Sequence, residues 1–222
     1  MGVLYIMVGP PACGKSTLAK EMSNILGTVT ISSDAVREEL YGDESVQKDH
    51  DKVFAICHAR MRRALRKQNV VFDATNIAPK HRISLVQMAK AEGNRCDEVV
   101  GIVYDGDLNL CLERNAGRKR KVPEGVIRNM YDTLKRFPPD FDEGFDALVA
   151  MSAMRKRIEK ANSDIPASEM AEAVEYILQE RCPHCKHRPG DPTSCKKKIK
   201  RTVDNWKCCG YSSRHWDEKL EF

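Results

Sequence analysis

Long apolar runs are absent from this 222-residue chain. No stretch approaches the roughly 20 apolar residues that a transmembrane helix requires, and the N-terminal segment continues into a charged helical pattern instead of a signal-peptide cleavage site. Internal repeats and low-complexity segments are also absent. From these absences we expect a soluble, cytoplasmic protein that is neither a membrane protein nor a repeat protein and has no membrane partner.

Net charge is absent from most of the chain and concentrated in its tail. Residues 1–179 contain 26 basic and 26 acidic side chains, and residues 180–222 contain 11 basic and 6 acidic ones, so the net charge of +5 comes from the tail. A basic segment is typical of proteins that contact a polyanion, although a solubilising surface has the same composition. The chain length allows one α/β core of about 150 residues with such an appended unit.

A nucleotide-binding motif lies close to the N-terminus. Residues 9–16 read Gly-Pro-Pro-Ala-Cys-Gly-Lys-Ser, between an apolar run at 3–8 and a helical pattern. This is the spacing of a P-loop, whose backbone N–H groups surround a phosphate while the following helix points its positive end at the same anion. Lys15 would reach the β- and γ-phosphates, and the Ser16 hydroxyl would bind Mg²⁺. A glycine-rich turn without a ligand is the alternative, but strand, spacing, lysine, serine and helix all favour nucleotide binding.

Apolar strand-like runs alternate with helical patterns along the first 150 residues. Strands are expected at 3–8, 28–32, 70–73, 99–104 and 147–151. The helical patterns cover about 15–25, the segment from 35 onward, 46–68, 79–92, 107–114 and the segment from 123 onward. The alternation favours an α/β fold with a P-loop NTPase-type, mostly parallel sheet, helices on both faces, and functional residues at the carboxyl ends of the strands.

Two carboxylates follow apolar strands at the edge of the sheet where the P-loop is expected. Asp34 precedes Arg37 by one helical turn after the second strand, and Asp73 ends the third strand. Asp34 could accept the proton of an attacking hydroxyl while Arg37 holds a phosphate of the acceptor, and Asp73 could support Mg²⁺. Helix capping and a strand-end turn are the open alternatives for these residues.

Cations gather between two later helices. Residues 114–121 read Arg-Asn-Ala-Gly-Arg-Lys-Arg-Lys, with five cations in eight residues. Such a segment suits a lid whose arginines close on the γ-phosphate in the transition state. It also fits a solvated basic loop.

The ordered set of motifs resembles the 5′-kinase domain of bacteriophage-type polynucleotide kinase. The set consists of Gly-x4-Gly-Lys-Ser, Asp34-x2-Arg37, Phe72-Asp73-Ala74-Thr75-Asn76-x4-His81-Arg82, and Arg114-Asn115-x2-Arg118 followed by Val122-Pro123-x2-Val126-Ile127. The match covers about residues 1–151. The resemblance implies ATP-dependent transfer of a phosphoryl group to the 5′-hydroxyl end of RNA or DNA.

The resemblance also implies roles on the acceptor side of the site. Asp34 would be the general base, Arg37 would contact the 3′-phosphate of the acceptor, and Asp73 would support the metal or the acceptor.

On the nucleotide side, Lys15 and Arg118 would stabilise the transferring phosphoryl group, Ser16 would bind Mg²⁺, and Arg114 would be a second lid contact. The expected ATP-binding residues are Gly9, Pro10, Pro11, Ala12, Cys13, Gly14, Lys15, Ser16, Thr17, Arg114 and Arg118.

One motif of the phage family is missing. No Asp-x-Asp-x-Thr sequence occurs in the chain, so we expect no 3′-phosphatase activity. Kinases of small molecules or nucleotides also carry an Asp-x2-Arg after the second strand, which keeps a small acceptor open. A nucleotide-gated nucleic-acid-binding protein without transfer is a further alternative.

The tail holds a cluster of cysteines with metal-ligand spacing. The expected Zn²⁺ ligands are Cys182, Cys185, Cys195 and Cys208, with Cys209 as the alternative fourth ligand and His184 or His187 as substitutes. A segment with so few apolar residues needs a bound metal to fold, although the cysteines could instead form a redox pair or stay as free thiols. It resembles a zinc ribbon. Its lysines and aromatic residues could hold a nucleic-acid strand, and a structural or protein-docking role is equally open.

We therefore divide the chain into three parts. Residues 1–151 are the expected P-loop kinase domain, 152–180 a helical extension packed on the core, and 181–222 the zinc-ribbon-like unit. The expected cofactors are ATP, Mg²⁺ and Zn²⁺, and the expected partners are nucleic-acid 5′-hydroxyl ends. A homo-oligomer and a repair or ligase partner stay open.

Overall fold

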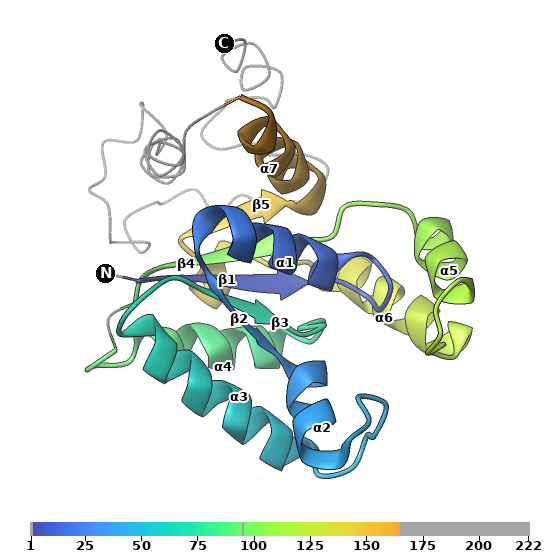
Figure 1. Cartoon of the computed structure of the whole chain (residues 1–222), viewed down its shortest axis with the longest axis horizontal. Coiled ribbons are helices and arrows are strands. Elements are labelled where there is room, and N and C mark those ends of the chain that lie inside the picture. Colours follow the sequence, from blue (N-terminus) through green and yellow to red (C-terminus); the bar gives the residue numbers. More distant parts are fainter. Residues whose placement is uncertain (1, 95, 165–222) are drawn as a thin grey trace. The chain divides into compact units, whose positions relative to one another are not determined.

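The computed structural model describes residues 2–94 and 96–164, in which strands and helices alternate (Figure 1). The strands are β1 (Gly2–Val8), β2 (Val29–Ser32), β3 (Val70–Asp73), β4 (Cys96–Val103) and β5 (Ala147–Ala150). The α-helices are α1 (Lys15–Leu26), α2 (Ser33–Tyr41), α3 (His50–Leu65), α4 (Pro79–Lys90), α5 (Leu108–Ala116), α6 (Glu124–Arg136) and α7 (Met151–Asp164), and a 3₁₀ turn, η1, spans Phe141–Glu143.

The five strands form one parallel sheet in the order β2-β3-β1-β4-β5. β1 lies at its centre, with Leu4 opposite Val70 on one side and Val99 on the other. Because all strands run in one direction, the loops after β1, β2 and β3 leave the same edge of the sheet. The predicted α/β fold with a parallel sheet is confirmed.

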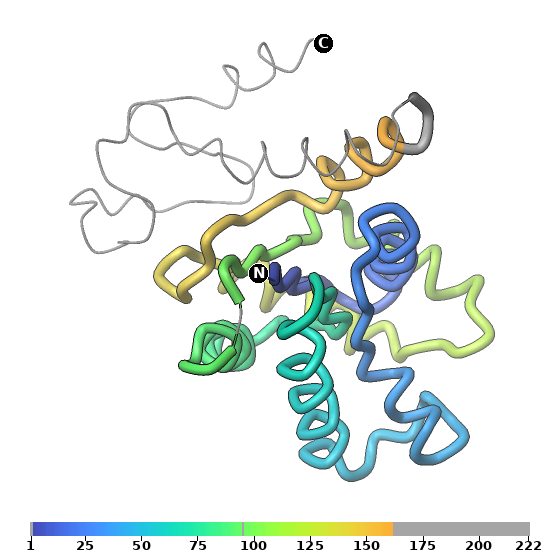
Figure 2. The backbone as a smooth tube through the Cα atoms, turned by 60° about the vertical axis from the view of Figure 1, so that its left-hand side comes forward, coloured from blue at the N-terminus to red at the C-terminus, as the bar shows by residue number. Residues whose placement is uncertain are grey.

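Helices cover both faces of the sheet, which explains the continuous apolar sequences of the central strands. α1 and α7 pack together on one face, and α3 and α4 lie on the other (Figure 1). Residues Leu4 to Val8 and Val70 to Phe72 are consequently buried, as expected for a parallel strand between two helical layers. α5 and α6 pack against each other. In Figure 2 the yellow-green connection between them lies near α2, in agreement with the 3.7 Å ion pair between Arg120 in that connection and Asp34 in α2.

Several element boundaries differ from the predicted ones, and the structure gives the reason for three of these differences. Ser33 and Asp34 belong to α2, because Ser32 caps that helix by accepting a hydrogen bond from the backbone N–H of Ala35 (3.4 Å). α3 begins at His50 and not at 46, because Asp49 has a left-handed backbone (φ 51°) that a helix cannot continue through. β4 begins at Cys96 and not at 99, since its first residues extend the pairing with β1.

The packed unit of the core reaches residue 165, so α7 belongs to it. Within the described part of the chain, no helix combines the length and the apolar character that crossing a bilayer requires. The predicted helix at 166–181 and the predicted cysteine-rich unit at 181–222 lie outside the described residues.

Candidate active site

The loop between β1 and α1 has the backbone of an anion cradle. Gly14, at the N-terminus of α1, has a left-handed backbone (φ 96°), as does Ala12 (φ 61°), and these turns fold the chain back on itself. The backbone N–H of Gly9 donates to the carbonyl of Thr75 (3.0 Å), which ties the loop to the segment after β3. A Cβ on Gly9 would lie 2.8 Å from the sulfur of Cys13, so only glycine fits there.

The Lys15 ammonium group lies inside this loop. The side chain is 7% exposed, and Nζ donates to the Pro10 carbonyl at 2.7 Å. The sulfur of Cys13 is 3.5 Å away. The structure thus places Lys15 inside the loop, as the P-loop spacing leads one to expect, and its contact with the β- and γ-phosphates of a nucleotide stays a prediction.

The carboxyl group of Asp73 and the hydroxyl of Ser16 lie close to Lys15 and to each other. Asp73 ends β3 and is 6% exposed, and burial raises the pKa of its carboxyl group. Lys15 and a hydrogen bond from the Ser16 hydroxyl act in the opposite direction without cancelling that effect. A hydroxyl and a carboxylate are the hard oxygen ligands that Mg²⁺ prefers, so these two residues fit the metal of a P-loop kinase.

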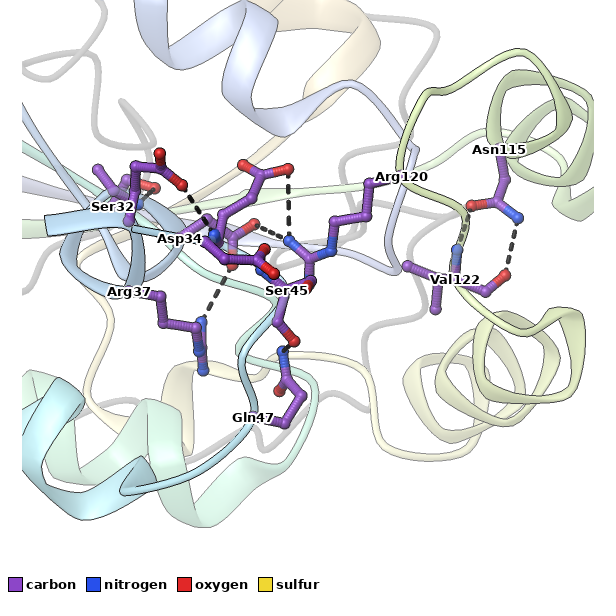
Figure 3. Close-up of polar contacts among 12 residues, drawn as sticks. Ser32, Asp34, Arg37, Ser45, Gln47, Asn115, Arg120 and Val122 are labelled. Atoms are coloured by element: carbon purple, nitrogen blue, oxygen red, sulfur yellow. Dashed lines mark hydrogen bonds and ion pairs between the residues drawn. The ribbon is translucent and has the colours of Figure 1, made fainter. Parts of the chain in front are cut away.

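Asp34 and Arg37 form an ion pair on the first turns of α2. Arg37 Nη1 donates to Asp34 Oδ1 at 3.0 Å (Figure 3). The carboxylate side chain is 45% exposed, whereas Arg37 as a residue is only 5% exposed. Its Nε is buried and finds no hydrogen-bond partner among the residues that the structure describes. The pair therefore combines an accessible base with an incompletely satisfied cation.

The cationic segment between α5 and α6 closes over this pair. We define the lid loop as residues 116–121. Its two ends are joined by the buried Asn115, whose Nδ2 donates to the Val122 carbonyl (2.8 Å) and whose Oδ1 accepts from the Val122 N–H (2.9 Å). Near its C-terminal end, Arg120 Nη1 lies 3.7 Å from Asp34 Oδ2 and 3.5 Å from Glu44 Oε1 (Figure 3). The lid thus reaches across to α2.

Two further arginines contact the outside of the P-loop. Arg114 Nη1 donates to the Cys13 carbonyl at 3.2 Å, and Arg155 Nη2 donates to the Gly14 carbonyl at 2.8 Å. Arg155 lies on α7, 141 residues after Gly14, and no sequence signal pointed to it. Sequence reasoning also missed Glu44 and did not separate Arg120 from its neighbours.

The structure brings most of the predicted site residues to one edge of the sheet. The P-loop, Asp73 and the Asp34–Arg37 pair lie there, and the charge of Arg118 acts on the pKa of Asp73. Asn76, which follows Asp73 in the motif, is instead engaged in the fold, since its buried Nδ2 donates to the Met7 carbonyl at 2.8 Å. The predicted zinc ligands Cys182, Cys185, Cys195, Cys208 and Cys209 lie outside the described residues.

Comparisons with known proteins agree with this geometry. Residues 4–137 match a protein family described as an AAA domain. An L-seryl-tRNA(Sec) kinase from Methanococcus maripaludis is 32% identical over 143 residues, which are 59% of this chain and 51% of that protein. The chain therefore matches about half the length of this curated relative.

Solved structures share the fold. A chain of the Pnkp1/Rnl/Hen1 RNA repair complex superposes with a TM-score of 0.52 and 21% identity, covering 61% of this chain and 44% of that one. Shikimate kinase from Bacteroides thetaiotaomicron superposes with a TM-score of 0.50 and 15% identity, covering 78% and 98%. The match over residues 4–137 shows that the chain belongs to this AAA-domain family, and the loop that holds the buried Lys15 has the geometry of a P-loop.

Proposed function

We propose that this protein is a kinase that transfers the γ-phosphoryl group of ATP to the 5′-hydroxyl end of a polynucleotide. One observation carries the proposal: the buried Arg37, whose Nε has no hydrogen-bond partner among residues 2–94 and 96–164, is held by the accessible Asp34 beside the P-loop. A cation with unused donors suits an anionic group of the acceptor, and a nucleotide at a polynucleotide end carries such an anion in its 3′-phosphate.

The chemical step uses residues on both sides of the acceptor hydroxyl. The hydroxyl oxygen forms a new bond to the γ-phosphorus, the bond between that phosphorus and the β–γ bridging oxygen breaks, and ADP leaves with its electron pair. Asp34 takes the hydroxyl proton. Lys15 and Arg118 stabilise the charge on the transferring group. Ser16 and Asp73 would hold Mg²⁺, and the chemistry that the metal would supply there is neutralisation of charge on the phosphate oxygens.

The P-loop and lid bind the nucleotide in this proposal. The buried Lys15 stays inside the loop, and Arg114 and Arg155 hold the loop's outer carbonyls in place. Because the two arginines approach from α5 and α7, they couple the position of the P-loop to both helices. A preorganised loop spends less binding energy on ordering itself when ATP arrives.

The tail extends the proposal on the basis of its sequence alone. We propose that residues 181–222 bind Zn²⁺ and contact the acceptor strand through their lysines and aromatic side chains. Metal analysis of the purified chain and of a Cys182→Ser variant tests the first part. Loss of salt-dependent strand binding on deletion of 181–222 tests the second.

A second candidate acceptor is a hydroxyl of an amino acid carried by a tRNA. The observation that favours it is the 32% identity to an L-seryl-tRNA(Sec) kinase. The Asp34–Arg37 pair is compatible with this acceptor as well, because a tRNA end also offers a hydroxyl near phosphates.

The experiment that tests the proposal measures transfer of labelled γ-phosphate from ATP to 5′-hydroxyl RNA, 5′-hydroxyl DNA and seryl-tRNA, with Asp34→Asn as the control. We expect transfer to a 5′-hydroxyl end that falls by about 10²- to 10⁴-fold in the variant. Transfer to seryl-tRNA alone would replace the first proposal by the second. Transfer to neither, with intact ATP binding, would contradict both.

A further inference from the structure

A row of aromatic rings extends from the surface of α3 to the strand that carries Asp73. The ring centroids of His50 and Phe54 are 4.6 Å apart, those of Phe54 and His58 are 6.0 Å apart, and those of His58 and Phe72 are 5.9 Å apart. Phe72 immediately precedes Asp73 on β3. We call His50, Phe54, His58 and Phe72 the ring row.

The core packing of α3 does not explain the outer members of the row. The buried side of that helix is formed by Val53, Cys57, Met61 and Leu65. The rings at 50, 54 and 58 follow a stripe displaced by one residue, in which His50 is exposed and Phe54 and His58 are half-buried. The row therefore begins on an accessible aromatic surface and ends in the core.

The row adjoins the acceptor side of the site. The α3 end that carries His50 is tied to α2 by a hydrogen bond from the Tyr41 hydroxyl to Asp49 Oδ2 (2.9 Å). On the next helix, His81 lies near both His50 and His58, as their electrostatic effects on one another show. α3 and α4 thus place imidazole rings at the edge of the sheet where the reacting hydroxyl would arrive.

The chemistry of these rings favours a flat, uncharged ligand. Burial lowers the pKa of His58, which belongs to the row, and of His81, which lies beside it, and this favours the neutral form of both imidazoles. Neutral aromatic rings stack on the π-faces of nucleobases, and each stacked base contributes a large part of single-strand binding without depending on base identity. Exposed lysines at 48 and 80 flank the row and suit the phosphates of the same strand.

We propose that the ring row is a stacking site for unpaired nucleobases at the 5′ end of the acceptor, with His50 and Phe54 as its contact surface. This inference rests on the proposed polynucleotide kinase function and sharpens it. It makes the preferred acceptor a single-stranded end, because a base within a duplex has its faces covered by its neighbours.

The test measures binding and transfer separately with the full chain. Fluorescence anisotropy gives the Kd of a 5′-hydroxyl oligonucleotide and of the same oligonucleotide with abasic residues at its first two positions. The protein is compared with His50→Ala, Phe54→Leu and a matched Lys52→Ala control on the same exposed turn. We expect each ring variant to raise the Kd of the normal strand about tenfold and to leave that of the abasic strand unchanged.

Two conservative variants separate stacking from folding. His50→Phe retains a ring and should keep the wild-type Kd, and Phe54→Leu retains the apolar volume while removing the ring. Equal losses for normal and abasic strands, or an unchanged Kd in both ring variants, would overturn the inference. Transfer assays on the same strands report on the function independently: ring-dependent binding without transfer would contradict the kinase proposal and leave the stacking site standing.

Discussion

Two buried arginines, Arg82 and Arg37, differ in how many of their guanidinium nitrogens donate hydrogen bonds within the protein. Arg82 is 0% exposed and its Nε donates to Glu143 Oε2 at 2.6 Å, with Nη2 bonded to the other oxygen of the same carboxylate. Its remaining donors reach the carbonyls of Asn76, Ile77 and Phe137. Every nitrogen of this guanidinium is used within the protein.

Arg37 is almost as buried but makes far fewer contacts. Its side chain donates a hydrogen bond to Asp34, a half-exposed carboxylate that Arg120 also approaches. Its Nε has no partner within the described part of the chain. A buried cation costs free energy unless its partners compensate, so an arginine left incomplete is unfavourable for stability. The difference indicates that Arg82 holds the fold together, and it supports the ligand-binding role that we propose for Arg37.

The largest expected effect on stability comes from removing Arg82, the arginine whose donors are all used within the protein. Arg82→Ala leaves the nearly buried Glu143 without its partner, and we expect the free energy of unfolding to fall by about 3 to 5 kcal/mol. Urea denaturation measures this loss. The control is Arg128→Ala, because Arg128 forms an exposed pair with Glu124 at 3.6 Å and its removal should cost less than about 1 kcal/mol. Equal losses in the two variants would remove the structural role assigned to Arg82.

Arg37→Ala is expected to affect the acceptor and not the fold. Removing a charged hydrogen-bond donor should raise the KM of an acceptor with a 3′-phosphate by about 10- to 150-fold. The KM of a nucleoside without that phosphate should change much less, and the KM of ATP should stay the same. Steady-state kinetics with both acceptors check this prediction. A loss of stability as large as that of Arg82→Ala would contradict the comparison.

The lid gives a smaller effect. Asn115→Ala removes both hydrogen bonds between Asn115 and Val122, which hold the two ends of the lid loop together, and leaves the N–H and carbonyl groups of Val122 unpaired. We therefore expect a loss of about 1 to 2 kcal/mol in the free energy of unfolding. The value of kcat should fall as well, since the loop that carries Arg118 and Arg120 would no longer be held together at its two ends. Asn109→Ala on the exposed side of the same helix is the matched control. Unchanged kcat in Asn115→Ala would show that the lid needs no such anchor.

The smallest expected effect concerns pH. Burial, the charge of Arg62 and the nearby His81 lower the pKa of His58 below its ordinary value, so the unfolded chain binds a proton that the folded chain refuses. Above about pH 6.5 His58 is neutral in both the folded and the unfolded chain and does not change the free energy of unfolding. Below that pH the unfolded chain is favoured by the proton it binds, so the free energy of unfolding declines. Thermal unfolding at pH 7.5 and pH 5.5 should show a lower Tm at the acidic pH, and His58→Phe should reduce the difference. A pH dependence of the same size in the variant would assign it to other groups.

Local patterns in the sequence predicted the elements better than their ends. The alternation of apolar and amphipathic segments located all five strands, because a parallel strand between helices is apolar throughout. The beginning of α3 escaped prediction because Val46 continues the apolar spacing, whereas the left-handed Asp49 ends any helix there. A backbone angle of this kind has no signature in hydrophobic periodicity.

The sequence by itself determined the P-loop, the position of Asp73 after its strand and the spacing of Asp34 and Arg37, because each depends on residues close together in the chain. Only the tertiary structure decided that Arg82 joins Glu143 across 61 residues, that Arg155 reaches Gly14 across 141, and that Arg120 meets Asp34. The reason is that ion pairs between distant segments depend on how helices pack on the sheet. Packing is a property of the whole core, and no short stretch of sequence carries it.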